Sequence, residues 1–563
     1  MTTERLYHYN KELKNQQQLV AALAHLHPHL DSLDNALTDP HCKRTVEGAL
    51  FLNADIHRML DKNLSEFQQT LLNTLYPHYQ PAMPAMGVVQ LLPKTSHKTT
   101  LPSGTRIRTD PAHGEECIFT SRYSVNVQPI EVTETSFIGN ILRLTLTCPE
   151  SLTFSHLQPE CLRFFINAPH EHACLMYEWL MNQTTQLRIN NISLETQALQ
   201  PVGFTVKEGM LPYTSRTFIG YRLLMEYFHF PEKFLFFELQ GLEKIAWPKE
   251  HKVQLEFHFK TPQPFLTKQL NARWFLLGCT PIVNLFPHDL EPIKLTYDKT
   301  DYQLIPETQR IPQALEVHTI QRVLGIDAQQ QGMEYLPLYG QQYNTDYPLA
   351  GYWYAHHREN MFLSILDASQ HPNVTLCVKA LCTNRHLPSE LPTGGNEPRL
   401  LHEHAYVRSL MPLTPARRLY REQTNPTHWQ LISHLATHYV SLSQEEDDTL
   451  QNLRNILELY DVNHNEQTSL LHLSTEPVTY RSPQSRGTAF RQGVHITLVV
   501  DESKFTGTNL YFFGCILERF LALYVTIEGF TQLTIITHDK KTEYRYPPRD
   551  VGELMDSLTA TVP

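Results

Sequence analysis

The chain has 563 residues, and at roughly 150 residues per domain this length predicts three or four structural units rather than one globule. Hydrophobic residues make up 41% of the chain and aromatic residues 10%, which excludes wholesale disorder. The 47 lysines and arginines are outnumbered by 58 acidic residues, giving a net charge of −11. Such a chain would repel phosphate backbones, so nucleic acid is not an expected partner.

The cysteines and the first residues indicate a reducing compartment. Nine cysteines are scattered without CxxC spacing, so a disulfide scaffold is not expected. The chain opens on the charged and polar MTTERLYHYNKELK rather than on an apolar signal sequence, and no run approaches 18 apolar residues. We therefore expect a soluble, cytosolic protein with reduced thiols and no direct membrane insertion.

Residues 1–84 are predicted to form a helical bundle region. Leu6, Leu13, Val20 and Leu23 recur at spacings that place them on one face of a helix. Such an apolar stripe forms either a local helical core or the seam of a bundle shared with another chain. The residues alone leave both possibilities open.

From about residue 85 to 480 the hydrophobic period shifts toward two, which is typical of strands. Leu142–Leu146 and Val253–Phe259 alternate cleanly, so each should be a strand with one buried face. We divide this stretch into a β-rich domain at 85–270 and a second, mixed β-rich domain at 271–480. A short helix is expected near residues 171–182.

Three local features lie within the second of these domains. The Pro- and Gly-rich passage Leu387–Pro398 predicts an exposed loop or hinge. In the strand-like run Leu376–Thr383, at least one of Cys377 and Cys382 should be a core residue. The acidic run Glu445–Asp448 precedes leucines at helical spacing, so it should begin a helix rather than bind a metal.

The last part, residues 481–563, predicts a small α/β domain. Val494–Val500 is β-branched and apolar, Asn509–Tyr524 has the pattern of an apolar and aromatic helix, and Gln532–Thr537 returns to strand. The predicted fold class is therefore α+β and multi-domain, with an N-terminal helical region, a large β-rich middle and this C-terminal domain.

The sequence contains no recognisable catalytic motif. It has no GxSxG elbow, no GxxxxGK[ST] loop and no GxGxxG turn. The cluster His170–Cys174 contains ligand-type residues but lacks the second histidine of HExxH, and His402–His404 has no downstream ligands at useful spacing. We expect no enzyme activity, no metal and no cofactor, and keep a zinc-dependent hydrolase built around His170 or His402 as the alternative.

A series of blocks, in order along the chain, resembles one protein family. Tyr9–Leu13 is similar to a YNxEL opening and Asn73–Tyr79 to an LLYPHY signature. Further blocks are Pro102–Arg106, Gly220–Phe237, Cys279–Phe286, Glu291–Ile293, Leu381–Arg385, Leu387–Pro388, Trp429–Leu435, Leu517–Tyr524 and Phe530–Leu533. Together they resemble the TssF family, also called VasA or ImpG, of the bacterial type VI secretion system baseplate.

The resemblance implies a structural role in a contractile injection machine related to phage tails. In the family, two TssF copies join one TssG in a wedge that also contacts TssK and TssE. Wedges surround the VgrG spike, support the sheath and tube, and dock on the inner-membrane complex through TssK. A phage-tail-like baseplate protein outside type VI secretion is the alternative within this class.

The resemblance makes three sets of apolar residues candidates for partner interfaces. They are Leu6, Leu13, Val20 and Leu23 in the N-terminal stripe, Tyr227, Phe228 and Phe230 in the aromatic middle segment, and Phe512 and Phe520 in the C-terminal helix. The alternative for Tyr227–Phe237 is a strand buried on both faces. The alternative for the C-terminal pair is packing against neighbouring strands.

Overall fold

The structure is a computed structural model of the chain. It describes residues 14, 51, 82–94, 98–109, 116–190, 192–213, 219–262, 269–307, 314–338, 347–357, 360–367, 373–391, 399–400, 407–414, 446–461, 469–481, 490–505, 508–522, 529–539 and 542–550. The predictions for Leu6, Leu13, Val20 and Leu23 fall outside these residues. Lys14 lies in a helix with its side chain exposed, and Phe51 also lies in a helix.

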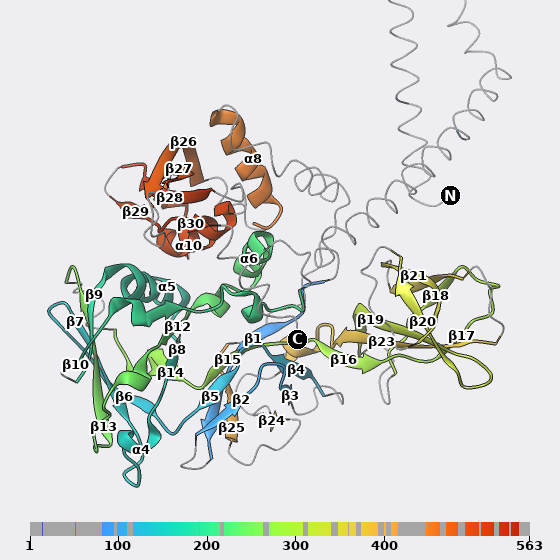
Figure 1. The fold of residues 1–563 in the computed structure, drawn as a ribbon, viewed down its shortest axis with the longest axis horizontal. Coiled ribbons are helices and arrows are strands. Elements are labelled where there is room, and N and C mark those ends of the chain that lie inside the picture. The colour runs from blue at the N-terminus through green and yellow to red at the C-terminus, as the bar shows by residue number, and fades with distance from the viewer. Residues whose placement is uncertain are drawn as a thin grey trace, which may run out of the picture. The chain divides into compact units, whose positions relative to one another are not determined.

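The chain divides into two compact units. One combines residues 1–74 with 424–432, and the other combines residues 75–423 with 433–563. The described part of the second unit is built mainly from strands, with few helices among them (Figure 1). The predicted α+β class with a β-rich middle is confirmed. No helix among the described residues is long and apolar enough to span a membrane.

A six-stranded sheet gathers strands from distant parts of the chain. Its order is β24 (Arg399–Leu400), β3 (Arg106–Arg108), β4 (Ile118–Ser121), β15 (Cys279–Val283), β1 (Met86–Pro93) and β25 (Val407–Pro412). Strand β1 pairs antiparallel with both β15 and β25. These pairings cross the boundary predicted at residues 270/271, so the sequence-based division there is corrected. Strands at 86–93 and 279–283 belong to one sheet.

A five-stranded sheet contains both of the strands predicted from alternation. Its order is β10 (Ile192–Leu194), β9 (Thr184–Ile189), β13 (Lys252–Phe259), β7 (Ile141–Thr147) and β6 (Glu131–Ile138). Strands β13 and β7 are neighbours, with Leu255 opposite Leu144 and Val253 opposite Leu146. These four side chains are buried, so the predicted apolar face is confirmed.

Two smaller sheets and short helices complete this region. The four-stranded sheet has the order β11 (Leu199–Pro201), β12 (Phe236–Leu239), β8 (Leu162–Ile166) and β14 (Phe275–Leu277), and β2 (Thr99–Leu101) pairs with β5 (Val125–Val127). Helix α4 spans Phe154–Leu157. Helix α5 (His170–Glu178) continues into a π-helix at Trp179–Gln183, which confirms the helix expected near residues 171–182.

An eight-stranded sheet is formed between residues 286 and 383. Its path is β16 (Phe286–Asp289), β23 (Thr375–Thr383), β19 (Glu316–Ile326), β20 (Gly332–Pro337), β21 (Leu349–His357), β22 (Met361–Leu366) and β18 (Asp301–Gln303), and β17 (Ile293–Lys294) also pairs with β23. Cys382 is fully buried in the hydrophobic core of this sheet and Cys377 is half-buried, as predicted.

The C-terminal part has the predicted strand, helix and strand order. Strands β26 (Leu470–Arg481), β27 (Phe490–Val500), β28 (Phe530–Thr537) and β29 (Glu543–Arg545) are neighbours in that order, and β30 (Arg549–Asp550) also pairs with β28. Helix α10 (Leu510–Leu521) connects the parallel strands β27 and β28. Helix α8 (Glu446–Glu458) begins in the acidic run, as predicted. The boundary placed at 480/481 cuts the end of β26 and is corrected.

Two further predictions agree with the structure only in part. Of the segment Tyr227–Phe237, for which a buried strand was the alternative, residues 227–229 end helix α6 (Ile219–His229), and the strand β12 begins only at Phe236 (Phe236–Leu239). The start of the expected exposed loop at Leu387 is a short 3-10 helix, Leu387–Glu390, in which Pro388 is buried. Leu387 and Leu391 pack against the hydrophobic core beside the six-stranded sheet. Residues 392–398 lie outside the described residues.

Candidate functional site

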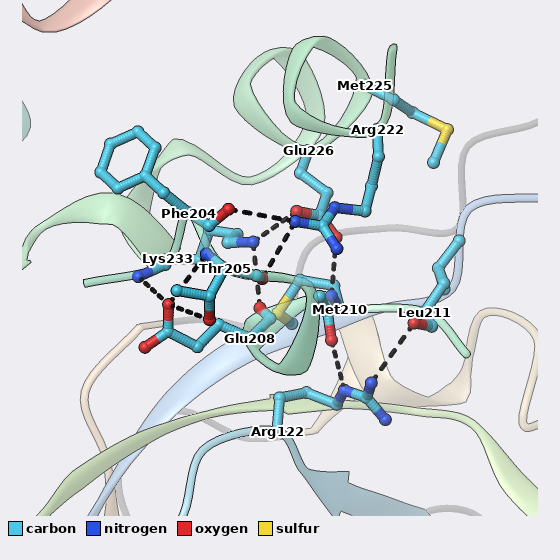
Figure 2. A network of polar contacts seen from close by, with 12 residues as sticks. Arg122, Phe204, Thr205, Glu208, Met210, Leu211, Arg222, Met225, Glu226 and Lys233 are labelled. Carbon is cyan, nitrogen blue, oxygen red and sulfur yellow. Dashed lines mark hydrogen bonds and ion pairs between the residues drawn. The ribbon is translucent and has the colours of Figure 1, made fainter. Parts of the chain in front are cut away.

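Helix α6 and the short 3-10 helix after it, Pro231–Phe234, carry three buried charged residues (Figure 2). Arg222 and Glu226 lie one turn apart on α6, and Lys233 follows in the 3-10 helix. Their exposed fractions are 1%, 0% and 0%. Charged side chains are rarely this buried unless they are paired, so their partners define what the site does.

Glu226 and Lys233 form a buried ion pair with further hydrogen bonds on each side. The Lys233 ammonium donates to the Glu226 carboxylate and to the backbone carbonyl of Glu208 at 3.1 Å. The other carboxylate oxygen of Glu226 accepts the Met210 backbone N–H at 2.6 Å. The ammonium also lies 4.6 Å from the ring centroid of Phe234. These contacts offset much of the cost of removing both charges from water.

Arg222 binds the loop that faces α6. Its guanidinium donates to three consecutive backbone carbonyls, those of Phe204, Thr205 and Val206, at 3.0–3.3 Å. The same group lies 5.2 Å from the ring centroid of Tyr213. A planar guanidinium with several donors suits this task better than an ammonium would. Arg222 therefore fixes the path of residues 204–206 against the helix.

The same loop is held from two other sides. Within it, the Glu208 carboxylate accepts hydrogen bonds from the backbone N–H groups of Gly203 and Thr205 and from the Thr205 hydroxyl at 2.9–3.1 Å. From the connection between β4 and β5, Arg122 donates to the carbonyl of Gly209 at 2.7 Å and to that of Leu211 at 3.3 Å. We call residues 203–211 the clamped loop.

Glycine is required at the start of the clamped loop. Gly203 has φ +102°, a conformation that side chains rarely adopt. A Cβ atom there would lie 2.9 Å from the Lys233 carbonyl oxygen and 3.0 Å from the Tyr123 hydroxyl. That hydroxyl donates to the same carbonyl at 2.9 Å. The Lys233 carbonyl therefore leaves no room for a side chain at position 203.

Burial and the neighbouring charges shift the pKa values of the central pair. Burial lowers the pKa of Lys233 to about 8, although the Glu226 carboxylate opposes the shift. Burial alone would raise the pKa of Glu226, but Lys233 and Arg222 outweigh it and hold that pKa below its ordinary value. Both groups are therefore charged at neutral pH, and the pair is an ion pair.

Helix α6 packs against helix α10 (Figure 1), and aromatic rings of the two helices meet in this contact. Tyr221 meets Phe520 edge to face at a centroid distance of 5.4 Å, and Tyr227 lies 5.6 Å from Phe512. Phe512 also contacts Tyr177 of α5 at 5.3 Å. Such ring pairs add about 0.5–1.5 kcal/mol each beyond the area they bury. The rings join the C-terminal sheet and its helix to the middle of the chain.

Polar contacts flank this aromatic junction. The Glu178 carboxylate of α5 accepts hydrogen bonds from the side-chain amide of Asn509 at 2.7 Å and from the Tyr544 hydroxyl at 3.0 Å. On the other side, the Arg519 guanidinium of α10 lies 3.8 Å from the ring centroid of Phe204 in the clamped loop. The buried charges and the aromatic junction are therefore physically continuous.

The structure places five of the predicted interface residues at this junction. Tyr227, Phe230, Phe512 and Phe520 are at most 2% exposed, and Phe228 is half-buried. The rings of Tyr227, Phe512 and Phe520 pack against other rings of the same chain. No partner chain is present, so a role of these residues in partner contacts stays a prediction.

The sequence patterns did not single out the charged residues of this site. Arg222, Glu226 and Lys233 lie inside an aromatic-rich block of the resemblance, Gly220–Phe237, and the interface candidates in that block are aromatic residues. The available signal was the presence of three charges within an otherwise apolar helix, since such charges need buried partners. Those partners are backbone groups of the clamped loop, which carry no sequence signature.

No group of three or more potential metal ligands occurs within the part of the chain that the structure describes. In the cluster singled out from the sequence, the His170 ring nitrogen lies 3.7 Å from the Cys174 sulfur. Burial raises the pKa of that thiol to about 12, so it is not ionised at neutral pH. His402–His404 lie outside the described residues. The site around Arg222, Glu226 and Lys233 joins chain segments through hydrogen bonds and an ion pair.

Comparisons with known proteins agree with one another. The family model described as "Type VI secretion system, TssF" matches residues 1–553. A Pseudomonas aeruginosa protein, type VI secretion system component TssF1, is 29% identical over 614 aligned positions, which cover 97% of this chain and 98% of that protein. The fold is similar to a chain in the cryo-electron microscopy structure of the type VI secretion system TssK–TssF–TssG baseplate subcomplex. That match has a TM-score of 0.75 and 23% identity, and covers 90% of this chain and 98% of that one.

Proposed function

The chain belongs to the TssF family of the type VI secretion system, and we propose on that premise that it is a structural subunit of the system's baseplate. The observation that carries the proposal is the family match across residues 1–553, which leaves only the last ten residues unmatched. The similar fold in a solved baseplate subcomplex supports it. The subunit would act in the cytoplasm, in a baseplate docked at the inner membrane.

The proposed direct partners are TssG and TssK. Their support is the composition of the solved baseplate subcomplex, which is the TssK–TssF–TssG subcomplex. A second copy of this chain, TssE and the VgrG spike follow from the family resemblance alone and complete the proposed wedge. We propose no nucleic-acid partner, because the chain carries a net charge of −11.

A structural role without catalysis fits the chemistry of the candidate site. Its charged groups bind backbone carbonyls, backbone N–H groups and one another rather than an open cleft. Buried polar networks of this kind rigidify a fold and specify one packing. A baseplate subunit has to hold several segments in fixed relation while partners load it, and the junction of α6, α10 and the clamped loop would do so.

We place the contact with TssG on the apolar stripe of the N-terminal region. Replacing Leu13, Val20 and Leu23 together with aspartate should abolish co-purification with TssG, because three carboxylates cannot be buried in a helical seam. Lys14→Asp is the matched control, since Lys14 lies exposed on a helix in the same region. The control should still bind TssG.

Complementation in cells tests the function itself. A strain that lacks the gene should assemble no contractile sheath on the type VI machine, and the wild-type gene should restore fluorescent sheath assembly. The triple aspartate variant should fail to restore it although the protein is present at normal levels. Normal sheath assembly in the deletion strain would contradict the proposed function.

A further inference from the structure

The segment that forms the eight-stranded sheet is inserted in the sequence between two strands of the six-stranded sheet. We call this segment the insert. The chain leaves the six-stranded sheet at Val283, the end of β15, and enters the insert at Phe286, the start of β16. It leaves the insert at Thr383, the end of β23, and then forms the 3-10 helix that begins at Leu387. The two crossings are therefore only a few residues long.

One asparagine lies in each crossing, and the two are bonded to each other. The Asn284 side-chain carbonyl accepts the Asn384 backbone N–H at 2.7 Å. In return, the Asn284 side-chain amide donates to the Asn384 side-chain carbonyl at 2.7 Å. The two residues are 0% and 1% exposed, so the bonds are shielded from water. We call this pair the asparagine clasp.

The clasp is also bonded to β4 of the six-stranded sheet and to residues just before β4 and β1. The Asn384 side-chain carbonyl accepts the Ile118 N–H at 3.0 Å, and its amide donates to the Glu116 carbonyl at 3.2 Å. The Asn284 amide donates to the Ile118 carbonyl at 2.8 Å, and its backbone N–H donates to the Ala85 carbonyl at 2.8 Å. The carboxamide group of each asparagine thus bonds both to the other asparagine and to β4.

Contacts on either side of the clasp hold the crossings in place. After Asn284, the Leu285 carbonyl accepts the Thr120 hydroxyl of β4 at 2.7 Å. After Asn384, Arg385 adopts φ +52° and its guanidinium lies 3.6 Å from the Glu316 carboxylate of β19. The 3-10 helix that follows then packs on the core of the six-stranded sheet through Leu387. Both crossings are therefore short and are held by contacts on each side of the clasp.

We propose that the asparagine clasp is a rigid joint that fixes the orientation of the insert, residues 285–383, relative to the six-stranded sheet. Domains joined by exposed linkers normally move relative to each other. Here a rotation of the insert would have to break buried amide bonds and leave their donors and acceptors without partners. Force applied to the insert would reach the six-stranded sheet through the clasp.

Single-molecule fluorescence tests the joint in the full chain. One dye is placed at Ser103, exposed beside the six-stranded sheet, and the other at Gln329, exposed on a turn of the insert. Unnatural amino acids carry the dyes, because the chain has nine cysteines. The wild type should give one narrow distance distribution, and Asn384→Ala should give a broad or divided one. A second dye pair within the insert, Lys299 and Gln329, should stay narrow in both proteins.

A matched variant separates the clasp from a general loss of hydrogen bonds. Asn140→Ala removes a side-chain bond to the Phe259 carbonyl within the five-stranded sheet and should leave the distribution narrow. If Asn384→Ala does not fold, Asn384→Asp keeps the shape and the acceptor but loses the bond to Glu116, and it should broaden the distribution. A broad distribution in the wild type would overturn the proposal, as would a narrow one in a folded clasp variant.

Discussion

The carboxylate of Glu178 on α5 accepts a 2.7 Å hydrogen bond from the side-chain amide of Asn509, 331 residues later in the chain. The side-chain oxygen of Asn509 in turn accepts the Tyr511 backbone N–H, which caps the start of α10. One asparagine therefore both begins the C-terminal helix and attaches it to the middle of the chain. Tyr544 of β29 donates to the same carboxylate.

Removing this carboxylate should loosen the C-terminal helix. Glu178→Ala leaves the half-buried Asn509 amide and the buried Tyr544 hydroxyl without this acceptor, which costs about 1–3 kcal/mol. Hydrogen exchange in α10 should accelerate accordingly. Glu160→Ala is the control, because Glu160 forms an exposed ion pair with Lys98 and its loss should change little. Equal exchange in both variants would show that Glu178 does not anchor the helix.

Truncating Phe512 should destabilise the chain more than truncating Phe228. Phe512 is fully buried among Tyr177, Tyr227 and Phe234, so Phe512→Ala should cost about 3–5 kcal/mol and lower the thermal unfolding midpoint. Phe228 is half-buried, so Phe228→Ala should cost less. A Phe512→Ala protein that keeps its unfolding midpoint but no longer binds TssG would favour an interface role over a core role.

The buried ion pair should be strongly coupled. Lys233→Met leaves the Glu226 carboxylate with only Arg222 and Arg122 as cationic neighbours among the described residues and should cost about 3–5 kcal/mol. Adding Glu226→Gln removes the stranded charge while an oxygen remains for the Met210 N–H, so the double variant should be more stable than Lys233→Met alone. Hydrogen exchange of the backbone amides in the clamped loop measures the opening free energy of the single and of the double variant. Strictly additive losses would mean that the two charges do not interact.

The lowered pKa of Lys233 predicts a specific pH dependence. The pKa of Lys233 is about 8 in the folded chain and 10.5 in the unfolded chain. Between these two pH values, the unfolded chain holds a proton on Lys233 that the folded chain has released. The unfolded state then binds more protons, so this group makes the free energy of unfolding rise with pH, by at most about 1.4 kcal/mol per pH unit. Below pH 8 this gain is lost.

Comparing wild type with Lys233→Met isolates this contribution, because all other titrating groups are shared. Opening free energies of the clamped loop, corrected for the intrinsic pH dependence of exchange, should rise more steeply between pH 8 and 9.5 in the wild type. Parallel profiles for the two proteins would show that the Lys233 pKa is not lowered in the folded chain.

Local sequence patterns predicted two kinds of element correctly. These are strands that bury one face, and helices that show an apolar run or an acidic first turn. Leu142–Leu146 and Val253–Phe259 alternate because one face of each strand is buried. The helix at Asn509–Tyr524 was predicted from its apolar and aromatic run, and the structure shows Asn509 as its capping residue. The acidic run at the start of α8 indicated where that helix begins.

The features that the sequence did not predict have two physical causes. One is burial on every side, and the other is pairing between residues far apart in the chain. Residues 220–227 of α6 are buried on every side, so no polar face reveals the helical period, and the aromatic content favoured strand. Strand β1 pairs with residues 189 or more positions away, which local patterns cannot indicate. Asn284 and Asn384 are likewise 100 positions apart, and nothing in either neighbourhood marks the other.

The central claim, that this chain is a baseplate subunit, is tested most directly by co-expressing it with TssG. After purification, the mass of the complex is measured by size-exclusion chromatography with light scattering. TssK is added in a second run. We predict a stable complex that contains this chain and TssG and gains mass when TssK is added. A monodisperse monomer of this chain that elutes apart from TssG would contradict the account.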